Sequence, residues 1–110
     1  MMLLLGSGTF VKNPEITEVG TTVKTSFSLV YNETYKDKTG EKTNIAHYLD
    51  CEAWDSAAKY IVKHCQKGDK IFIKAYPRQE KWESNGQKKQ RIVFRITEFD
   101  VFRYAEDEEV

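Results

Sequence analysis

The sequence predicts an all-β fold with one short helix, in which five strands close into a small Greek-key barrel. Most segments alternate apolar and polar residues with the period of two that is typical of half-buried strands. One segment changes to the helical period, and it follows the third of these strands. With 110 residues the chain has the size of one domain around one core.

Two strands are expected in the first third of the chain. The first covers residues 2–11, where Gly6 and Gly8 indicate a bulge or a sharp bend. The segment "NPEITEVGT" then turns the chain. The second strand covers residues 22–31, with Phe27 and Leu29 on its buried side.

A polar stretch, residues 32–44 ("NETYKDKTGEKTN"), separates the second strand from the third. Its composition and Gly40 predict a protruding hairpin loop. The third strand then covers residues 45–54. Its alternation places Ile45, Leu49, Cys51 and Ala53 inward, and Tyr48, Asp50, Glu52 and Trp54 outward.

The helix is expected over residues 55–68, with Asp55 as its N-cap and Gly68 as a left-handed C-cap. A fourth strand over residues 70–82, an Asn-Gly turn and a last strand over residues 91–102 follow. Three strands, one helix and two strands form the element order of a five-stranded barrel of the OB type. The apolar helix residues at helical spacing are Ala58, Ile61, Val62 and Cys65.

Charge is unevenly distributed along a chain whose formal net charge is zero. Residues 59–95 contain eleven Lys or Arg against three acids, whereas the end "EDEEV" contains four acids and no base. This segregation predicts a basic surface for a polyanion and a short acidic tail. We therefore divide the chain into a barrel domain, residues 1–103, and a tail, residues 104–110.

Several classes of protein are disfavoured by the composition. The apolar start "MMLLLG" is too short for a membrane span and lacks the basic region and cleavage site of a secretory signal. Cys51 and Cys65 are 14 positions apart without a second ligand pair, which disfavours a zinc site and a disulfide framework. We expect a cytoplasmic protein without metal or cofactor, and with buried thiols.

Aromatic residues occupy outward positions of the third and fourth strands, where lysines and arginines are interleaved with them. Bases of single-stranded nucleic acid stack on such rings with about 1 to 3 kcal/mol each, while the cations neutralise phosphates. The pattern therefore predicts a surface for single-stranded nucleic acid. The candidate rings are Tyr35, Tyr48, Trp54, Phe72, Tyr76 and Trp82.

Five phrases of the sequence together resemble the bacterial-type single-stranded DNA-binding proteins over about residues 3–102, a family that bacteriophages also encode. In order they are "LLLGSGTFVKNPEI", "SFSLVYNETYKDKTGE", "AHYLDCEAW", "KHCQKGDKIFIKA" and "RQEKWESNGQ". The resemblance implies an OB-fold that wraps single-stranded DNA over stacking rings without sequence preference. It also implies a homo-oligomer, a tetramer or a dimer.

By position, the resemblance assigns the family's stacking rings to Tyr35, Tyr48, Trp54 and Trp82. It assigns basic positions of the family to Lys36, Lys38, Lys67 and Arg78. To these four we add the basic residues of the fourth strand and the following hairpin. They are Lys70, Lys74, Lys88 and Lys89.

The sequence also departs from the family pattern. An acid, Glu80, lies two residues before Trp82 where a basic residue is common, and Asp50 and Glu52 lie on the expected binding face. These acids are expected to weaken the attraction for phosphates. The tail "YAEDEEV" replaces the long Gly/Pro/Gln-rich linker and its Pro-Phe tip, so recruitment of replication proteins would use a shortened form.

We conclude that the chain is expected to bind single-stranded DNA in replication, recombination or repair, without catalysis. Two binding alternatives remain: a primosome-type accessory protein that acts through protein contacts, and an RNA-binding OB domain. An enzyme is disfavoured, because Asp50, Glu52 and Asp55 have no evident general base beside them if they gather a divalent cation. The sequence leaves dimer or tetramer, and cellular or phage origin, open.

Overall fold

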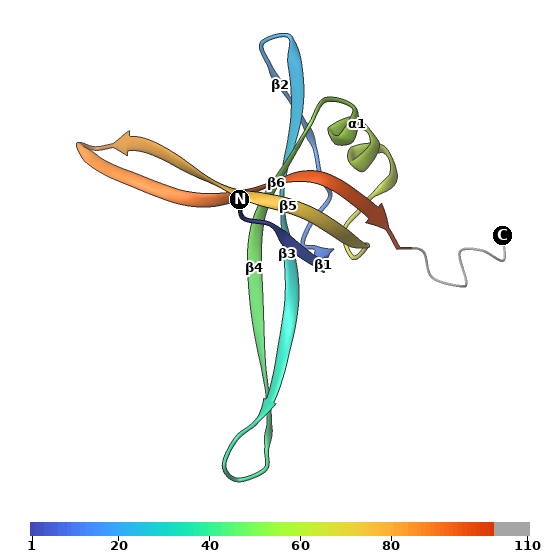
Figure 1. Cartoon of the computed structure of the whole chain (residues 1–110), viewed down its shortest axis with the longest axis vertical. Helices are drawn as coiled ribbons and strands as arrows, with labels where there is room; N and C mark the ends of the chain where they lie inside the picture. Colours follow the sequence, from blue (N-terminus) through green and yellow to red (C-terminus); the bar gives the residue numbers. More distant parts are fainter. Residues whose placement is uncertain (103–110) are drawn as a thin grey trace, which may run out of the picture.

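Seven elements, six strands and a helix, make up the part of the protein that the structure describes. The structure is a computed structural model and describes residues 1–102 (Figure 1). In chain order the elements are β1 (Leu4–Phe10), β2 (Ile16–Val19), β3 (Thr22–Lys36), β4 (Lys42–Trp54), α1 (Asp55–His64), β5 (Lys70–Ser84) and β6 (Gln87–Val101).

Five of these strands close into a barrel. The sheet order is β1-β5-β6-β4-β3-β2, and an additional pairing of β1 with β3 completes the ring. All pairings are antiparallel except a short parallel contact in which Cys51 and Glu52 of β4 face Phe94 and Arg95 of β6. The predicted all-β barrel of the OB type, with one short helix, is confirmed.

The core fills the barrel and the space under α1. Phe10 and Phe27 pack with their ring centroids 4.9 Å apart, and the alternation of β5 buries Ile71 and Ile73 as predicted. Gly8 permits the close crossing of β1 and β3, because a Cβ there would lie 2.9 Å from the Cβ of Leu29. The buried apolar residues are Phe10, Phe27, Leu29, Cys51, Ala53, Ala58, Ile61, Cys65, Ile71, Ile73, Ala75, Val93 and Ile96.

Two long hairpins project from this barrel, and Figure 1 shows both of them clearly. The β3–β4 arm continues its ladder from Lys24 opposite Trp54 to Lys36 opposite Lys42. Most of the predicted polar loop, residues 32–44, is therefore strand, and only its tip is a turn. Beyond the barrel both faces of a hairpin meet water, so its strands lose the apolar alternation that identifies them in a sequence.

The β5–β6 arm ends in the predicted Asn-Gly turn. Asn85 and Gly86 both have positive φ, 51° and 76°, as a two-residue hairpin turn requires. The ladder reaches Ser84 opposite Gln87, so β6 begins four residues before the predicted start of the last strand. A register shift occurs between Lys74 and Ala75.

Three local expectations were wrong. Residues 16–19 are a strand, β2, which pairs with the start of β3; its four residues are all exposed, so no buried face marked it. α1 ends at His64, with Cys65 rather than Gly68 at the C-cap. Asp55 is its first residue, not its N-cap, because Trp54 still has extended backbone angles and makes no side-chain cap.

Candidate nucleic-acid interface

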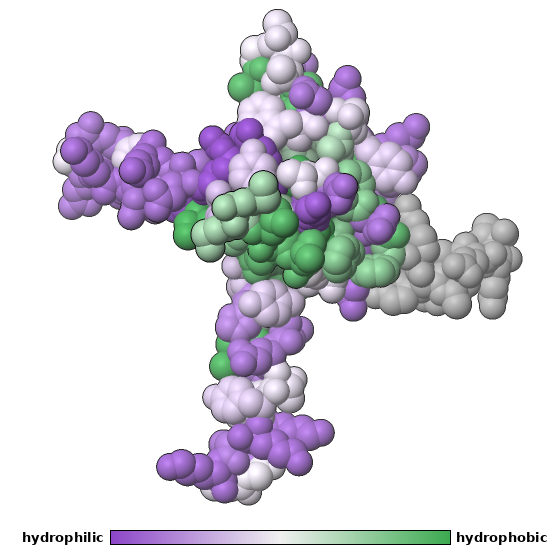
Figure 2. Space-filling model, viewed as in Figure 1, coloured by the Kyte–Doolittle hydropathy of each residue, from purple (hydrophilic) through white to green (hydrophobic). Residues whose placement is uncertain are grey.

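The exposed rings of the predicted site lie on the two arms. Tyr35 and Tyr48 of the β3–β4 arm are 46% and 67% exposed, and Trp82 of the β5–β6 arm is 43% exposed. Trp54, at the end of β4, is only partly exposed. In Figure 2 the surfaces of both arms are predominantly hydrophilic, so these rings lie among polar and charged neighbours.

The two tyrosines of the β3–β4 arm occupy different faces of the hairpin. Tyr48 lies opposite Val30, whereas Tyr35 lies opposite Thr43. Residues 30 and 35 of β3 differ by an odd number, and successive side chains of a strand point to opposite faces. A strand of nucleic acid that contacts both rings therefore has to pass around the arm.

Trp82 lies in the most complete arrangement of ring and cations. Lys89 of β6 is its partner directly across the hairpin, so the indole and the ammonium share one face. A shallow hollow of about 600 Å³ surrounds them. Its lining residues are Lys81, Trp82, Glu83, Lys88, Lys89 and Gln90.

Two of the three acids that depart from the family pattern, Glu80 and Asp50, are paired with an arginine that has no distinctive signal in the sequence. Arg91 of β6 lies 3.4 Å from a carboxylate oxygen of Glu80 and 3.9 Å from one of Asp50. The hydroxyl of Ser28 also donates a hydrogen bond to Asp50, at 3.0 Å. Arg91 thus connects the two arms near the barrel and reduces the negative charge that the acids contribute.

Glu52 was expected on the outward, water-exposed face of β4; the outward placement is correct, but the exposure is not. The residue is 1% exposed, and its Oε2 accepts hydrogen bonds from Arg78 Nη1 at 3.1 Å and Arg95 Nε at 2.7 Å. Burial opposes ionisation, but the hydrogen bond from Arg95 and the charges of both arginines outweigh it, so the pKa of Glu52 is lowered. The side chains of β5 and β6 cover this face of β4, which alternation within β4 cannot reveal.

Trp54 lies beside the same cluster. The Arg95 guanidinium is 5.1 Å from the centroid of its ring and the Lys24 ammonium is 5.5 Å away, both within cation–π range. Its indole Nε1 has no hydrogen-bond partner among the described residues, although the indole lies near enough to Glu52 to help lower that pKa. Trp54 is therefore held by cations, unlike the more exposed Trp82.

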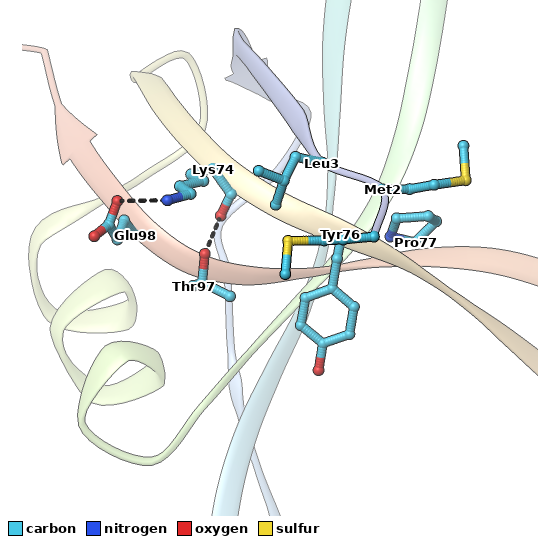
Figure 3. Close-up of a pocket in the computed structure, with 8 residues that line it drawn as sticks. Met2, Leu3, Lys74, Tyr76, Pro77, Thr97 and Glu98 are labelled. Carbon is cyan, nitrogen blue, oxygen red and sulfur yellow. Dashed lines mark hydrogen bonds and ion pairs between the residues drawn. The ribbon is translucent and has the colours of Figure 1, made fainter.

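Phe72 and Tyr76 lie away from the Trp82 hollow, on the side of β5 where β1 and the residues before it lie; Tyr76 is also the register partner of Arg95 in β6. Tyr76 lines an apolar groove of about 740 Å³ with Met2, Leu3 and Pro77, as Figure 3 shows. Phe72 pairs with Ser7 of β1 and lines a second hollow with Leu5. We call Met1, Met2, Leu3, Leu5 and Phe72, all exposed, the apolar patch. In Figure 2 hydrophobic residues gather at the centre of the view.

The predicted basic residues are dispersed over the molecule. Lys36 and Lys38 lie at the tip of the β3–β4 arm, and Lys88 and Lys89 near the tip of the β5–β6 arm. Lys67 lies between α1 and β5, and Lys70 is the first residue of β5. Both are at the end of β5 opposite to Trp82, about 40 Å of extended strand away. Lys74 lies 3.7 Å from Glu98, and Arg78 binds Glu52.

Within residues 1–102 no group of three or more His, Cys, Asp or Glu is arranged to hold a metal ion. The acids considered for an enzyme, Asp50, Glu52 and Asp55, therefore form no metal-binding cluster. Burial raises the pKa of the Cys51 thiol to about 12, which disfavours a reactive thiolate there. In the same part of the chain, no helix is both long and apolar enough to span a membrane.

An OB barrel whose arms carry exposed rings beside lysines has the architecture of the OB-fold domains that bind nucleic acids. Residues 2–102 match the single-strand binding protein family. The chain therefore belongs to this family, and the resemblance found in its phrases is confirmed.

Two curated relatives are identical to this chain at about a third of the aligned residues. The chain is 32% identical over 87 residues to the single-stranded DNA-binding protein of Aquifex aeolicus, covering 77% of this chain and 58% of the relative. It is 34% identical over 91 residues to that of Deinococcus radiodurans, covering 80% and 29%. The chain thus spans less than two thirds of the length of these relatives.

Solved structures share the fold at lower identity. The Plasmodium falciparum SSB in complex with ssDNA has a TM-score of 0.84 and 21% identity, covering 94% of this chain and 96% of that one. The single-stranded DNA-binding protein of Thermus aquaticus has a TM-score of 0.79 and 18% identity, covering 94% and 51%. At these identities the likeness establishes the fold.

Proposed function

We propose that this protein binds single-stranded DNA without sequence preference, by stacking bases on rings of its two arms while lysines and arginines hold phosphates. The observation that carries this proposal is the pairing of Trp82 with Lys89 on one face of the β5–β6 arm. The stacking residues that we propose are Tyr35, Tyr48, Trp54 and Trp82.

Ring and ammonium on one face match the two repeating parts of a single strand, the base and the phosphate. Every base has a π-face, so a ring platform of this kind does not discriminate between bases. The ammonium groups of Lys81, Lys88 and Lys89 surround the same hollow. The names of the relatives from Aquifex and Deinococcus support DNA as the ligand.

The phosphate contacts that we propose follow from exposure. Lys36, Lys38, Lys88 and Lys89 are exposed near the tips of the arms and form no ion pair within the described part of the chain. Arg78 keeps 36% of its side chain exposed while it binds Glu52. Lys67, Lys70 and Lys74 lie farther from Trp82, and we assign them to a longer DNA path along β5.

Quenching of tryptophan fluorescence by oligo-dT tests the proposal, because Trp54 and Trp82 are the two tryptophans of the chain. We expect quenching at low salt, with an affinity that falls as salt rises. About five neutralised phosphates correspond to a log-log slope near −3.5, at roughly 0.7 per phosphate on single strands. Absence of quenching by a protein whose circular dichroism shows it folded would contradict the proposal. An equal response to oligo-rU would remove the preference for DNA.

We also propose that a second copy of this chain covers the apolar patch. Leu5 is 64% exposed on β1 beside Phe72, and exposed apolar surface of this kind is typical of subunit contacts. Sedimentation velocity of the protein and of Leu5→Glu tests this proposal. We expect an oligomer for the first and a shift toward monomer for the second. An unchanged distribution would contradict the assignment.

The remaining expectations concern the cellular role. We propose that the protein acts in the cytoplasm on single-stranded DNA of replication, recombination or repair, as a binding protein without turnover. The acidic tail, residues 104–110, lies outside the described residues. Recruitment of replication proteins by this tail therefore remains a prediction from the sequence.

A further inference from the structure

We propose that Glu52 is a positioning residue of the DNA interface. Its buried carboxylate holds Arg78 and Arg95 in place, so that both guanidinium groups bind the phosphate of a nucleotide whose base stacks on Trp54. This inference rests on the proposed function. It assigns a favourable role to an acid that, by charge alone, opposes the binding of a polyanion.

The carboxylate joins three strands at one point. Glu52 lies in β4, Arg95 is its register partner in the parallel contact with β6, and Arg78 comes from β5. Both arginines donate to the same oxygen, Oε2, at 2.7 and 3.1 Å. The base of the β5–β6 arm is therefore fastened to the end of β4, where Trp54 lies two residues farther on.

The cluster retains positive charge for a ligand. Two guanidinium groups and one carboxylate have a net charge of +1, and each guanidinium has five N–H donors, of which Glu52 uses only part. The side chains of Arg78 and Arg95 remain 36% and 31% exposed, although the carboxylate between them is buried. A phosphate can thus reach the outer donors of both arginines without displacing Glu52.

The position of Arg95 also determines how Trp54 is presented. Its guanidinium lies 5.1 Å from the ring centroid while its Nε binds Glu52. An arginine held from behind by a carboxylate loses less conformational entropy when it binds a phosphate than one that is unrestrained. A base on Trp54 and its phosphate on Arg78 and Arg95 form the unit that Glu52 organises.

The alternative explanation, in which Glu52 acts only through its charge, predicts the opposite change in DNA affinity. If Glu52 acts on DNA only through its charge, its neutralisation removes repulsion and tightens binding. If it positions the arginines, its neutralisation releases two side chains and weakens binding, although the net charge of the protein becomes more positive. The direction of the change therefore separates the two explanations.

The test compares Glu52→Gln with a matched control, Asp50→Asn. Both changes replace an acid of β4 by its amide on the same face of the strand, but Asp50 is exposed and lies 3.9 Å from its arginine. For Glu52→Gln we expect about ten-fold weaker binding of oligo-dT, less Trp54 quenching, and a salt slope reduced by about 0.7, equivalent to one phosphate. For Asp50→Asn we expect slightly tighter binding and an unchanged slope.

Tighter binding of Glu52→Gln, equal to that of Asp50→Asn, would overturn the inference. Should Glu52→Gln not fold, Arg95→Lys replaces it, because this change keeps the charge and removes the planar guanidinium. We expect the same loss of Trp54 quenching, and affinity equal to that of the unchanged protein would overturn the inference. Failure of the unchanged protein to quench is a separate result, which contradicts the proposed function itself.

Discussion

The two arms are similar in architecture and different in charge. Each is a long antiparallel hairpin that extends from the barrel (Figure 1) and carries exposed rings. Residues 31–48, the β3–β4 arm, contain three lysines and three acids. Residues 79–92, the β5–β6 arm, contain four basic residues and two acids. Rings are thus distributed over both arms, whereas excess positive charge is found on one.

The way in which each arm is built explains this difference. In the β3–β4 arm two of the three acids are structural: Asp37 accepts hydrogen bonds from the backbone N–H groups of Thr39 and Glu41 in the turn, and Glu33 lies 2.9 Å from His47. The β5–β6 arm turns through the backbone angles of Asn85 and Gly86, without a charged group. Because the turn of the β5–β6 arm needs no carboxylate, the positive charge of this arm remains available for phosphates.

The largest expected effect is that of Trp82→Ala on the β5–β6 arm. Loss of a stacking platform costs about 1 to 3 kcal/mol of binding, or roughly 5- to 150-fold in affinity. Because Trp82 is exposed and far from the core, we expect a nearly unchanged melting temperature. Anisotropy of labelled oligo-dT and thermal melting measure the two quantities. A lowered melting temperature with affinity retained would show that Trp82 is structural.

The equivalent change on the other arm, Tyr35→Ala, sharpens the comparison. Tyr35 lies near the tip of an arm with balanced charge, so we expect a smaller loss, in the lower part of the same range of about 1 to 3 kcal/mol. The same anisotropy measurement applies. Equal losses for Tyr35→Ala and Trp82→Ala would show that neighbouring charge does not decide the strength of stacking.

A smaller effect is expected for paired lysine changes, which test phosphate attraction alone. The double change Lys88→Ala and Lys89→Ala should reduce the salt slope by about 1.4, at roughly 0.7 per phosphate. The matched double change Lys36→Ala and Lys38→Ala, on the β3–β4 arm, should reduce it by less. The measurement is oligo-dT affinity between low and moderate salt. A larger reduction of the salt slope for the β3–β4 arm than for the β5–β6 arm would contradict the proposed difference in charge between the arms.

The smallest expected effect is the pH dependence of the turn at Asp37, compared with the turn at Asn85 and Gly86. The hydrogen bond from Thr39, followed by the backbone N–H groups of the turn, lowers the pKa of Asp37 from its ordinary value of 3.8. Its stabilisation of the turn is therefore complete above that value, and it is lost as the pH falls through the lowered pKa. We expect the amide resonances of Thr39 and Glu41 to titrate below pH 3.8, whereas those of Asn85 and Gly86 do not.

Asp37→Asn is the control for this prediction. The amide keeps an oxygen acceptor and has no titration, so the resonances of Thr39 and Glu41 should no longer move at low pH. Movement of the Asn85 and Gly86 resonances over the same pH range would indicate that acid destabilises the whole molecule and not only the turn at Asp37.

The barrel was predictable because its signals are local. Alternation along β5 identified Ile71 and Ile73 as buried, and the Asn-Gly pair identified the turn at residues 85–86. The lengths of the arms were not predictable in this way, because their strands have water on both faces. The short β2 escaped detection for the same reason.

The interface was only partly predictable. Exposed positions of Tyr35, Tyr48 and Trp82 agree with the sequence pattern, although this exposure does not test their roles. Phe72 and Tyr76 have the same outward parity as Arg78 but lie toward the N-terminal segment: Phe72 is the register partner of Ser7 in β1, and Tyr76 lines a groove with Met2 and Leu3, which precede β1. Arg91 and Arg95 had no local signal, since their partners lie on other strands.

Hydrophobic periodicity along the chain was thus sufficient for the barrel and the presence of its helix, because the alternation within each strand shows which side faces the core. The family was identified by the resemblance of five sequence segments and not by periodicity. The role of Glu52 depended on the closed barrel. Alternation within β4 correctly placed this residue on the side away from Cys51. Only the pairing of β4 with β6, and the approach of Arg78 from β5, bury that side and convert an expected surface acid into an anchor for two arginines.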